Sequence, residues 1–463
     1  MKNIEITCIG AGYVGGPTMA VIALKCPDIK VNVVDINQER IDQWNGSLDK
    51  LPVFEPGLKD VIKETRNKNL FFSTDIEKAI NTSEIIFIAV NTPTKTEGEG
   101  KGMAADLKYV VATAETIAKF SKQNKIIVEK STLPVRTAEM LKKVLRKNNN
   151  KVDFEIVSNP EFLAEGTAIN DLFKSDRVLI GADETESGKK AMNKIIDIYS
   201  NWIPREKIIT SNVWSAELSK LSSNAMLAQR ISSINSLSAL CEKTEARIEE
   251  VSNAVGKDHR IGSHFLKSSV GFGGSCFKKD ILNLVYICRS YNLDEVADYW
   301  SQVIKINDYQ KERFSNLIID YLNKHNVTKA SILGWAFKKD TNDSRESAAI
   351  DITYNLISSG ISVDIYDPMV SNNRILQDIN NILLSKGAKN IDDLMRKVNI
   401  FSSINNCVNG HSAIAIITEW DEFKEYSWDE FYKKNTKEFK IFDGRGIIEM
   451  NNTDNLFKIG NPE

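Results

Sequence analysis

Short apolar runs alternate with longer amphipathic stretches over the first half of the chain. The apolar runs have the length of β-strands; they are IEITCI at 4–9, VNVVD at 31–35, LFFS at 70–73, EIIFIAV at 84–90, KIIVE at 125–129, FEIVS at 154–158 and RVLIG at 177–181. Helical patterns separate most of them, for example Asp106 to Lys122 and Pro134 to Lys147. Continuous apolar strands separated by helices predict a mostly parallel sheet covered on both faces. This first α/β unit extends to about residue 212.

The pattern changes to helical spacing after residue 212. No proline or glycine occurs from Val213 to Val255, and apolar side chains recur at helical intervals at Leu218, Leu221, Ala225, Ala228, Ile231, Ile234 and Cys241. This predicts one long helix, or two nearly continuous ones, ended by Gly256. More helix is expected from the glycine-rich segment near residue 275 to about Lys324.

Strands and helices alternate again from about residue 326. Strand patterns lie at 329–334, 361–368, 412–418 and 440–444, and a helix is expected from Arg345 to Ser359, ended by Gly360. The fold prediction is therefore α/β, with two Rossmann-like doubly wound parallel-sheet domains at 1–212 and 326–463. A long central helix and a helical middle domain, 213–325, join them. The polar segment 451–463 is expected to be loosely held and the loop 95–102 to be a mobile surface loop.

Composition and charge narrow the class of protein. Of 463 residues, 42% are hydrophobic and 26% charged, and the net charge is -2. These values are ordinary for a globular protein and provide no general attraction to nucleic acid or an anionic membrane. The longest apolar run is far shorter than the roughly 18 residues of a membrane helix, and the start of the chain is too rich in glycine for a signal peptide. A cytoplasmic enzyme without nucleic-acid or membrane partners is expected.

The cysteines argue against a metal or disulfide framework. Cys8, Cys26, Cys241, Cys276, Cys288 and Cys407 form no C-x-x-C pair, and the chain has four histidines. We therefore expect no zinc site, no disulfides and a reducing compartment. Four of the cysteines, at 8, 26, 241 and 288, lie in apolar surroundings and are predicted core residues.

A dinucleotide-binding motif follows the first predicted strand. Gly10, Gly12 and Gly15 form G-x-G-x-x-G, in which the glycines permit a tight turn, close approach to a pyrophosphate and packing of the helix on the strand. The N-terminus of the next helix offers free N–H groups to the phosphates. Asp35, at the end of the second strand, can bind the ribose hydroxyls and would repel a 2′-phosphate, which favours NAD over NADP. Arg40 is a candidate neighbour of the adenosine or a solvated helix residue.

The segment VGFGGSCFKKD at 270–280 places one cysteine at a predicted helix start. Ser275 is expected to cap the helix and Cys276 to lie in its first turn, where the helix dipole and nearby lysines lower the pKa of a thiol. Lys279 and Asp280 follow close to the same helical face. A thiolate beside a hydride acceptor suggests oxidation of an alcohol to an aldehyde, a thiohemiacetal, a thioester and finally an acid.

Other polar groups lie at strand ends, where open α/β sheets bind ligands. Glu161 and Glu165 follow one strand and Ser131 and Thr132 follow another. Lys220 and Asn224 are four residues apart on one face of the long helix, which indicates either an inward-facing site or a solvated stripe.

The second Rossmann-like region begins with SILGWAFKKDTNDSRES at 331–347. Its polar loop carries Lys338, Lys339 and Arg345, and Asp367 follows the next strand. The basic groups could balance a diphosphate, so we expect a nucleotide-like ligand here, although an ordinary charged loop has the same composition.

Together these segments resemble the UDP-glucose 6-dehydrogenase family of nucleotide-sugar dehydrogenases, especially its longer, eukaryote-type members. The motifs that carry the resemblance span nearly the whole chain: GAGYVGGP, FEPGL, NTPT, EKSTLPVRTAE, NPEFLAEGTA, SKLSSNAMLAQRISSIN, GFGGSCFKKD, AFKKDTNDSRES and FDGRG. The resemblance implies NAD-dependent oxidation of UDP-glucose to UDP-glucuronate by two NAD, with Cys276 as the covalent nucleophile. It also implies a homodimer built through the long helix, and a hexamer as a further possibility.

The same resemblance implies site residues. The catalytic set is Cys276, Lys220, Asp280, Asn224, Thr132 and Glu165. The cofactor-binding set is Gly10, Gly12, Tyr13, Val14, Gly15, Asp35, Arg40, Val90, Thr92, Ser131, Thr132, Glu165, Lys279 and Arg345. The set expected to bind the sugar nucleotide is Glu161, Phe162, Leu163, Glu165, Lys220, Asn224, Ile231, Arg260, Phe265, Lys267, Phe272, Gly273, Cys276, Phe277, Phe337, Lys338 and Arg445. Among these, Arg260 matches an arginine that reaches into the neighbouring subunit's site.

Two alternatives stay open at this point. A dehydrogenase of GDP-mannose or of a UDP-N-acetyl-hexosamine would share the same chemical residues. A nucleotide-sugar binding protein that has lost catalysis is a third reading, although all the proposed chemical residues are present.

Overall fold

The computed structural model describes residues 4–149, 151–435, 438–451 and 454–462 and divides into two compact units. Unit 1 comprises the chain up to Ser223 together with Leu282–Tyr291, and unit 2 comprises Asn224–Ile281 and the residues from Asn292 onwards. Helices α9 (Val213–Thr244) and α11 (Phe277–Ser290) contribute residues to both units. The division into three domains at residues 212 and 325 stays a prediction.

Unit 1 is built on an eight-stranded sheet with the order β3-β2-β1-β4-β5-β6-β7-β8. Its strands are β1 (Glu5–Ile9), β2 (Lys30–Val34), β3 (Leu70–Ser73), β4 (Ile85–Ile88), β5 (Lys125–Glu129), β6 (Phe154–Ser158), β7 (Val178–Ala182) and β8 (Ile208–Asn212). Neighbouring strands are parallel except for β6 and β7, which are antiparallel. The predicted, mostly parallel sheet is confirmed, while β8 was missed because its sequence IITSN is only partly apolar.

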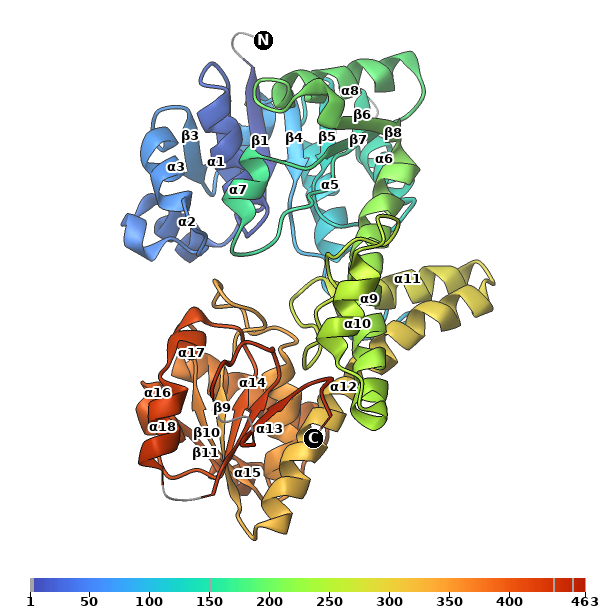
Figure 1. Ribbon diagram of the computed structural model, residues 1–463. Helices are drawn as coiled ribbons and strands as arrows, with labels where there is room; N and C mark the ends of the chain where they lie inside the picture. The colour runs from blue at the N-terminus through green and yellow to red at the C-terminus, as the bar shows by residue number, and fades with distance from the viewer. Residues whose placement is uncertain (1–3, 150, 436–437, 452–453, 463) are drawn as a thin grey trace. The chain divides into compact units, whose positions relative to one another are not determined.

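Helices cover both faces of this sheet (Figure 1). The helices of unit 1 between the strands are α1 (Gly15–Lys25), α2 (Gln38–Asn45), α3 (Leu58–Thr65), α4 (Ile76–Thr82), α5 (Lys108–Phe120), α6 (Thr137–Asn148), α7 (Ala168–Phe173) and α8 (Glu186–Tyr199). Alternate residues of β1 face opposite layers: Ile6 and Cys8 pack in one cluster with α1, whereas Ile9 packs in the other with α4 and α5. This alternation follows from the two-residue period of a strand.

Unit 2 is built on a six-stranded parallel sheet with the order β11-β10-β9-β12-β13-β14. Its strands are β9 (Lys329–Leu333), β10 (Ser362–Tyr366), β11 (Val398–Ile400), β12 (Ala413–Ile416), β13 (Lys440–Asp443) and β14 (Leu456–Lys458). Its other helices are α10 (Ile248–Gly256), α12 (Asp294–Lys324), α13 (Ala348–Ser358), α14 (Asn372–Ser385), α15 (Ile391–Met395), α16 (Ile404–Val408), α17 (Asp421–Glu425) and α18 (Trp428–Lys434). A large core cluster, with Ile332 and Ile365 fully buried, surrounds this sheet, and a smaller one joins Ile234, Cys241 and Ile248 of α9 and α10.

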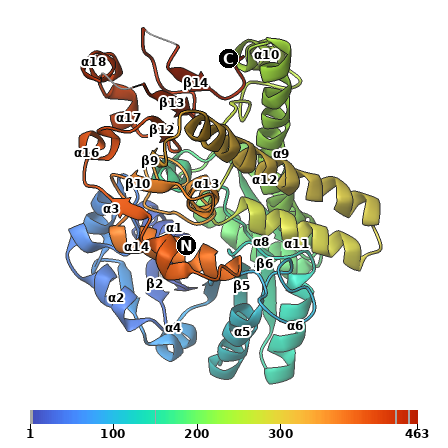
Figure 2. The same ribbon diagram turned by 90° about the horizontal axis from the view of Figure 1, so that it is seen from below.

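The central helical stretch is two helices, as one of the two predicted arrangements has it. Helix α9 ends at Thr244, Glu245 takes a positive φ of 57°, and α10 then ends at Gly256. Within unit 2, α12 crosses the C-terminal part of α9 (Figure 2), where the Ser232 hydroxyl donates to the Val303 carbonyl at 2.8 Å and Arg313 pairs with Glu242.

Two local predictions are wrong, and a third is not tested. The expected loose C-terminal segment instead forms β14, and the Gly460 N–H donates to Glu242 Oε1 at 2.8 Å. The loop 95–102 lies largely exposed at the surface, with the Lys95 N–H bonded to the Ala104 carbonyl at 2.9 Å, and its mobility stays a prediction. Helix α13 begins at Ala348 rather than Arg345, because Ser347 is extended (φ -59°, ψ 138°) and caps it.

The strand order reverses at the corresponding position in both sheets, next to the first strand of each. In unit 1 the chain reverses direction across the sheet between β1 and β4, and in unit 2 between β9 and β12. Ligands of open α/β sheets bind outside the carboxyl ends of the strands at such a switch point. Each unit therefore has one expected ligand-binding edge.

Candidate active site

The dinucleotide motif of unit 1 lies at its switch point. Gly10 follows β1 with φ +112°, and a Cβ there would lie 2.4 Å from the Ala89 carbonyl oxygen beyond β4. At Gly15, the first residue of α1, a Cβ would lie 2.0 Å from the Gly10 carbonyl oxygen. At Gly12, by contrast, an added Cβ would meet nothing within 4 Å. Packing thus requires glycine at positions 10 and 15, while Gly12 leaves open space above the loop.

Asp35 and Arg40 lie beside this loop. Asp35 Oδ2 accepts from the Ala11 N–H at 2.9 Å and from Arg40 Nη1 at 3.1 Å, and Asp35 Oδ1 accepts from the Asn37 N–H at 3.0 Å. A carboxylate has about four lone-pair positions, so one remains for a ribose hydroxyl. The open space at Gly12, the start of α1 at Gly15 and this carboxylate fit NAD. Tyr13 and Val14 belong to the same loop, where Val14 is the residue before α1.

A second group of predicted residues gathers at the ends of β4 and β5. The Ser131 hydroxyl donates to the Val90 carbonyl at 2.7 Å, and the Thr92 hydroxyl donates to the Thr132 carbonyl at 3.1 Å. These bonds hold the loop after β4 against the loop after β5. The Thr132 hydroxyl lies 3.5 Å from Glu161 Oε1, which comes from the loop after β6.

Lys220 is buried with its charge paired. Its Nζ lies 3.3 Å from Glu161 Oε1, and the two side chains are only 4% and 7% exposed. The Phe162 ring lies under two cations, with Arg177 Cζ at 3.9 Å and Lys220 Nζ at 5.5 Å from its centroid. The solvated stripe considered for Lys220 is therefore wrong, because α9 turns this side chain inward.

The loop that carries Glu161 and Glu165 is held by a buried carboxylate. Glu55 Oε1 accepts from the Gly166 N–H at 2.7 Å and Glu55 Oε2 from the Ala168 N–H at 3.1 Å. Leu163 packs at the edge of the core beneath this loop. Glu55 belongs to FEPGL, so only its motif marked it.

Sequence reasoning missed a carboxyl pair in unit 1. Glu129, the last residue of β5, and Glu217 in α9 are 1% and 2% exposed and interact electrostatically. Burial raises the pKa of Glu129 well above its usual range and that of Glu217 to about 7. Glu217 accepts from the Arg136 and Ala138 N–H groups at 2.7 and 2.8 Å, whereas neither carboxyl oxygen of Glu129 has a hydrogen-bond partner among the described residues. Burial therefore favours the protonated form of Glu129, and the two bonds to Glu217 tie the loop after Thr132 to α9.

In unit 2, Cys276 itself precedes the first residue of α11. The helix begins at Phe277, and its first bond runs from the Asp280 N–H to the Cys276 carbonyl at 2.9 Å. The prediction that Ser275 caps the helix is wrong by one residue, because the first accepting carbonyl belongs to Cys276. The Ser275 hydroxyl and the Cys276 thiol lie 3.5 Å apart. Cys276 is half-buried, whereas the other five cysteines are buried and free.

The side chains around the start of α11 form a polar cluster. Asn224 Nδ2 donates to Asp280 Oδ2 at 2.6 Å, and Lys279 Nζ lies 2.8 Å from Asp280 Oδ1. Asn224 and Asp280 are 6% and 1% exposed. A buried carboxylate between an amide and an ammonium group can accept or orient a proton at a reacting oxygen.

The glycine-rich segment before Cys276 packs on the loop after β9. The Gly274 N–H donates to the Arg345 carbonyl at 2.8 Å, and a Cβ on Gly273 would lie 2.6 Å from the Glu346 carbonyl oxygen. The Phe337 ring covers Gly274, and Phe272 and Phe277 meet edge to face. The glycines that precede the cysteine and the predicted sugar-nucleotide loop are thus in direct contact within unit 2.

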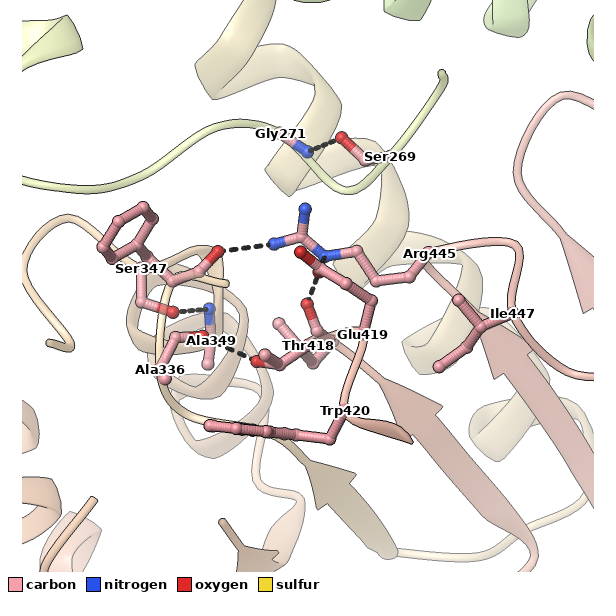
Figure 3. A network of polar contacts seen from close by, with 12 residues as sticks. Ser269, Gly271, Ala336, Ser347, Ala349, Thr418, Glu419, Trp420, Arg445 and Ile447 are labelled. Carbon is pink, nitrogen blue, oxygen red and sulfur yellow. Dashed lines mark hydrogen bonds and ion pairs between the residues drawn. The ribbon is translucent and has the colours of Figure 1, made fainter. Parts of the chain in front are cut away.

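Arg445 joins three strand ends in unit 2 (Figure 3). Its Nε donates to the Ile417 carbonyl at 2.6 Å and lies 3.2 Å from Glu419 Oε2, and its Nη2 donates to the Phe337 carbonyl at 3.0 Å. The Thr418 hydroxyl donates to the Ala336 carbonyl at 2.6 Å in the same network. The predicted ligand contact Arg445 therefore also holds the loops after β9 and β12.

The other basic residues of the loop after β9 already have partners. Arg345 forms a fork with Asp343, with Nε 2.9 Å from Oδ1 and Nη2 2.6 Å from Oδ2, and Lys339 lies 2.8 Å from Asp421 Oδ1. Lys338 Nζ lies 5.7 Å from the Phe337 ring centroid. Their predicted roles toward cofactor or nucleotide stay predictions.

Four further predicted residues belong to unit 2. Arg260 is exposed and pairs with Asp258, and Phe265 is 43% exposed with a positive φ of 61°. Lys267 is exposed, and its Cε would lie 3.7 Å from a Cβ on Gly446, the residue after Arg445. Ile231 lies half-buried on α9. Exposed residues on the 258–267 loop are in a position to meet a ligand or another chain.

The described part of the chain has neither a candidate metal cluster nor a candidate membrane helix. Residues 4–149, 151–435, 438–451 and 454–462 contain no cluster of three or more His, Cys, Asp or Glu side chains suited to a metal ion. Among the helices of those same residues, none combines the length and apolar character needed to span a membrane.

Comparisons with known proteins agree over the whole chain. Residues 4–203 match the NAD binding domain of the UDP-glucose/GDP-mannose dehydrogenase family, 214–309 its central domain and 331–450 its UDP binding domain. The chain is 55% identical to UDP-glucose 6-dehydrogenase of Drosophila melanogaster, over 96% of this chain and 93% of that protein. It is 52% identical to UDP-glucose 6-dehydrogenase 4 of Arabidopsis thaliana, over 99% and 97%.

Solved structures show the same fold. A UDP-glucose dehydrogenase from Pyrobaculum islandicum superposes with a TM-score of 0.82 at 26% identity, covering 98% of this chain and 96% of that one. A UDP-D-ManNAc dehydrogenase from Pyrococcus horikoshii superposes with a TM-score of 0.81 at 24% identity, covering 99% of both chains.

Proposed function

The chain belongs to the UDP-glucose/GDP-mannose dehydrogenase family, and from this premise we propose that it oxidises UDP-glucose to UDP-glucuronate through a thioester on Cys276. It is an NAD-dependent oxidoreductase. The observation that carries the cysteine step is the position of Cys276: it is the half-buried cysteine, it precedes α11, and it lies beside the Asn224–Asp280 pair.

The overall reaction consumes one alcohol, two NAD and one water, and yields one carboxylate, two NADH and three protons. NAD, when bound, accepts one hydride from the alcohol and one from the thiohemiacetal. The Cys276 thiolate adds to the aldehyde carbon, which forms the C–S bond of the thiohemiacetal. After the second oxidation, water attacks the thioester, the C–S bond breaks and the thiolate is restored.

The handling of the protons and the water is proposed by resemblance to the family. Asp280, held by Asn224, and Lys220, held by Glu161, correspond to the family's two polar groups that act on the reacting oxygen and the water. A fixed ammonium group stabilises a developing oxyanion most in a water-poor site, and Lys220 is 4% exposed. Thr132 and Glu165 position the hydrolytic water.

The sugar nucleotide is proposed to bind to unit 2. The family's UDP binding domain spans residues 331–450, which include Phe337, Lys338 and Arg445. The glycine-rich segment packs directly on the loop that carries Phe337, so a nucleotide held there would place its sugar near the Cys276 loop. UDP-glucose is preferred to GDP-mannose or a UDP-N-acetyl-hexosamine because relatives above 50% identity are named UDP-glucose 6-dehydrogenases.

We also propose a homodimer through α9, with a hexamer as a further possibility, in a reducing, cytoplasmic compartment. Support for the dimer comes from apolar side chains exposed along α9, which include Met226 (60%) and Leu240 (58%). A contiguous exposed apolar face on a soluble protein usually marks an interface. Support for the compartment comes from five buried free cysteines, Cys8, Cys26, Cys241, Cys288 and Cys407. Light scattering and sedimentation would give the number of subunits.

The deciding experiment is a product assay with UDP-glucose. We expect two NADH per UDP-glucuronate, without released aldehyde, and an acid-production rate at least about a thousandfold lower in Cys276→Ser. Binding of UDP-glucose to Cys276→Ser should survive. Unchanged acid production by this variant would exclude covalent catalysis at Cys276, and faster turnover of GDP-mannose or of a UDP-N-acetyl-hexosamine than of UDP-glucose would overturn the substrate assignment.

A further inference from the structure

The segment Ser269–Gly274, which leads to Cys276, lies outside both sheets, yet its backbone groups have defined partners. The Val270 N–H donates to the Gly444 carbonyl at 2.9 Å, and the Gly274 N–H donates to the Arg345 carbonyl at 2.8 Å. The Gly271 N–H bonds the Ser269 hydroxyl at 3.3 Å, as Figure 3 shows. An irregular buried segment needs such partners because unpaired backbone groups away from water cost free energy.

Three buried side-chain amides provide the remaining partners. Asn235 Oδ1 in α9 accepts from the Ser269 N–H at 2.9 Å, and Gln310 Nε2 in α12 donates to the Ser269 carbonyl at 2.8 Å. Asn307 in α12 makes two bonds to one residue: its Oδ1 accepts from the Phe272 N–H at 2.8 Å and its Nδ2 donates to the Phe272 carbonyl at 3.1 Å. Asn235 and Gln310 are 0% exposed and Asn307 is 2% exposed.

The pairing of Asn307 with Phe272 reproduces the pattern of an antiparallel strand pair, in which two residues exchange both hydrogen bonds. It leaves little freedom around Phe272. Gly271 has a φ of +116°, and a Cβ there would lie 2.8 Å from Asn307 Oδ1. The contact between Asn307 and this backbone therefore depends both on the amide of Asn307 and on the lack of a side chain at Gly271.

We propose that Asn307 is a positioning residue for the proposed nucleophile: its double bond to Phe272 fixes the course of the segment and thereby the placement of the Cys276 thiol. This inference rests on the proposed function, in which Cys276 attacks the substrate. Asn307 acts through the backbone of Phe272 and is assigned no contact with substrate. A displacement of about 1 Å at a reacting group can reduce a rate on the order of a hundredfold.

The test compares Asn307→Ala with Asn307→Asp. We expect Asn307→Ala to lower kcat by about 10- to 100-fold while KM for UDP-glucose and for NAD stays within about threefold. Alkylation of Cys276 by iodoacetamide, followed by peptide mass spectrometry, should become several-fold faster, because the released segment exposes a half-buried thiol.

Asn307→Asp provides the conservative variant. A protonated carboxyl can accept from the Phe272 N–H and donate to its carbonyl, whereas a carboxylate can only accept. The charged groups around this part of α12 are Asp308, Lys311 with its partner Asp351 in α13 at 2.7 Å, and the Lys278–Glu346 pair at 2.8 Å. The ratio of variant to wild-type kcat should therefore be highest at low pH and fall as pH rises. If Asn307→Ala does not fold, this pH dependence alone decides.

Asn355→Ala is the matched control. Asn355 lies in α13, donates to the Ser315 hydroxyl of α12 at 3.0 Å and has no bond to the segment, so kcat should stay within about twofold. The proposal is overturned if Asn307→Ala keeps wild-type kcat, if it shares its loss with Asn355→Ala, or if the Asp variant's ratio is independent of pH. Failure of the covalent mechanism shows separately, as retained acid production by Cys276→Ser, whereas the alkylation rate reports on the position of the thiol itself.

Discussion

The two Rossmann-like sheets share one backbone arrangement after their first strands, namely a glycine with positive φ and an aspartate after the second strand, but the two aspartates have different hydrogen-bond partners. After β1 the Gly10 N–H bonds the Val34 carbonyl at 2.8 Å, and after β9 the Gly334 N–H bonds the Tyr366 carbonyl at 2.8 Å. Both glycines have positive φ, +112° and +101°, and an added Cβ at either would strike a residue just after the strand across the switch point, Ala89 after β4 or Thr418 after β12. In each unit a carboxylate after the second strand accepts the next N–H, Asp35 from Ala11 at 2.9 Å and Asp367 from Trp335 at 2.6 Å.

The two arrangements then diverge. Asp35 accepts three hydrogen bonds, whereas Asp367 accepts five, two of them from the Met369 and Val370 N–H groups. Helix α1 starts at once, at Gly15, whereas α13 starts only at Ala348, after a polar loop. In unit 1 the N-terminus of α1 and the Asp35 carboxylate are therefore available to a ligand. In unit 2 the Asp367 carboxylate is used by the protein itself, and only the side chains of the loop before α13 are available.

Exchanging the two aspartates for asparagine should give opposite phenotypes, and this is the largest expected effect. Asp367→Asn turns an NH₂ group toward at least two buried donors, so the free energy of unfolding should fall by about 4 kcal/mol, with NAD affinity unchanged. Asp35→Asn should instead weaken NAD binding about tenfold. Denaturant titration and NAD titration measure the two; equal loss of stability in both variants would remove the distinction.

The buried carboxyl pair of unit 1 should make the stability of the protein depend on pH. Burial raises the pKa of Glu217 to about 7, and that of its partner Glu129 higher than usual. In the unfolded chain the two carboxyls ionise near pH 4.5, whereas in the folded protein they ionise only at higher pH. The pair therefore contributes its full stabilisation below pH 4.5, and this contribution falls as pH rises toward 7.

Glu129→Gln should remove most of that fall. An amide at 129 carries no charge, so ionisation of Glu217 no longer places two negative charges side by side, and at pH 8 the variant should be more stable than wild type by about 2–3 kcal/mol. Denaturant titrations at several pH values from 5 to 8 measure this. Asp443→Asn is the contrasting change, because Asp443 accepts three backbone N–H groups and should lose stability at every pH. Parallel pH curves for wild type and Glu129→Gln would contradict the assignment.

A substitution at Gly12 should affect NAD binding but not the packing of the protein. Gly12→Ala adds a methyl group that meets no protein atom within 4 Å, so stability should change little, while NAD affinity falls about 10- to 100-fold because the methyl enters the space above the loop. Gly15→Ala is the matched comparison and should destabilise the fold by about 1–3 kcal/mol through contact with the Gly10 carbonyl. Calorimetry with NAD and a thermal scan distinguish the two, and unaltered NAD affinity in Gly12→Ala would place the pyrophosphate elsewhere.

The smallest expected effect concerns Lys339. Its ion pair with Asp421 is exposed on both sides, 38% and 64%, so Lys339→Ala should change stability by less than about 0.5 kcal/mol. KM for UDP-glucose should also stay within about threefold, because the charge already has an acidic partner. A tenfold rise in KM would show that Lys339 leaves Asp421 to bind the diphosphate.

Much of this could be predicted from the sequence. Two-residue and 3.6-residue periodicities located β3, β5 and β6 at their observed bounds and located α9 and α10, because burial of one face leaves its period in the chain. The dinucleotide motif could also be predicted from the sequence. G-x-G-x-x-G and Asp35 belong to a single β-α-β unit, so their roles depend only on residues close in sequence. The less apolar strands β8, β11 and β14 were missed, since their sequences carry little of that period.

The start of α11 shows where local reasoning ends. A helix start near Cys276 could be read from the glycines and the charged residues that follow. Which residue precedes the helix depended on one bond, from the Asp280 N–H to the Cys276 carbonyl, and the prediction of Ser275 was wrong. The hydroxyl of Ser275 made it the better capping candidate by type, but the packing of Gly273 and Gly274 against the loop after β9 set the register.

The sequence by itself determined the order of elements, the two Rossmann-like regions, the dinucleotide loop and the identity of the reactive cysteine as a candidate. Tertiary structure alone decided which distant groups meet: Glu129 with Glu217, Lys220 with Glu161, Arg445 with the Phe337 carbonyl, and Asn307 with Phe272. The physical reason is that periodicity reports whether a side chain is buried, whereas its partner depends on how separate segments cross in space. A buried amide such as Asn307 therefore looks like any polar residue in a long helix until the backbone it holds is seen.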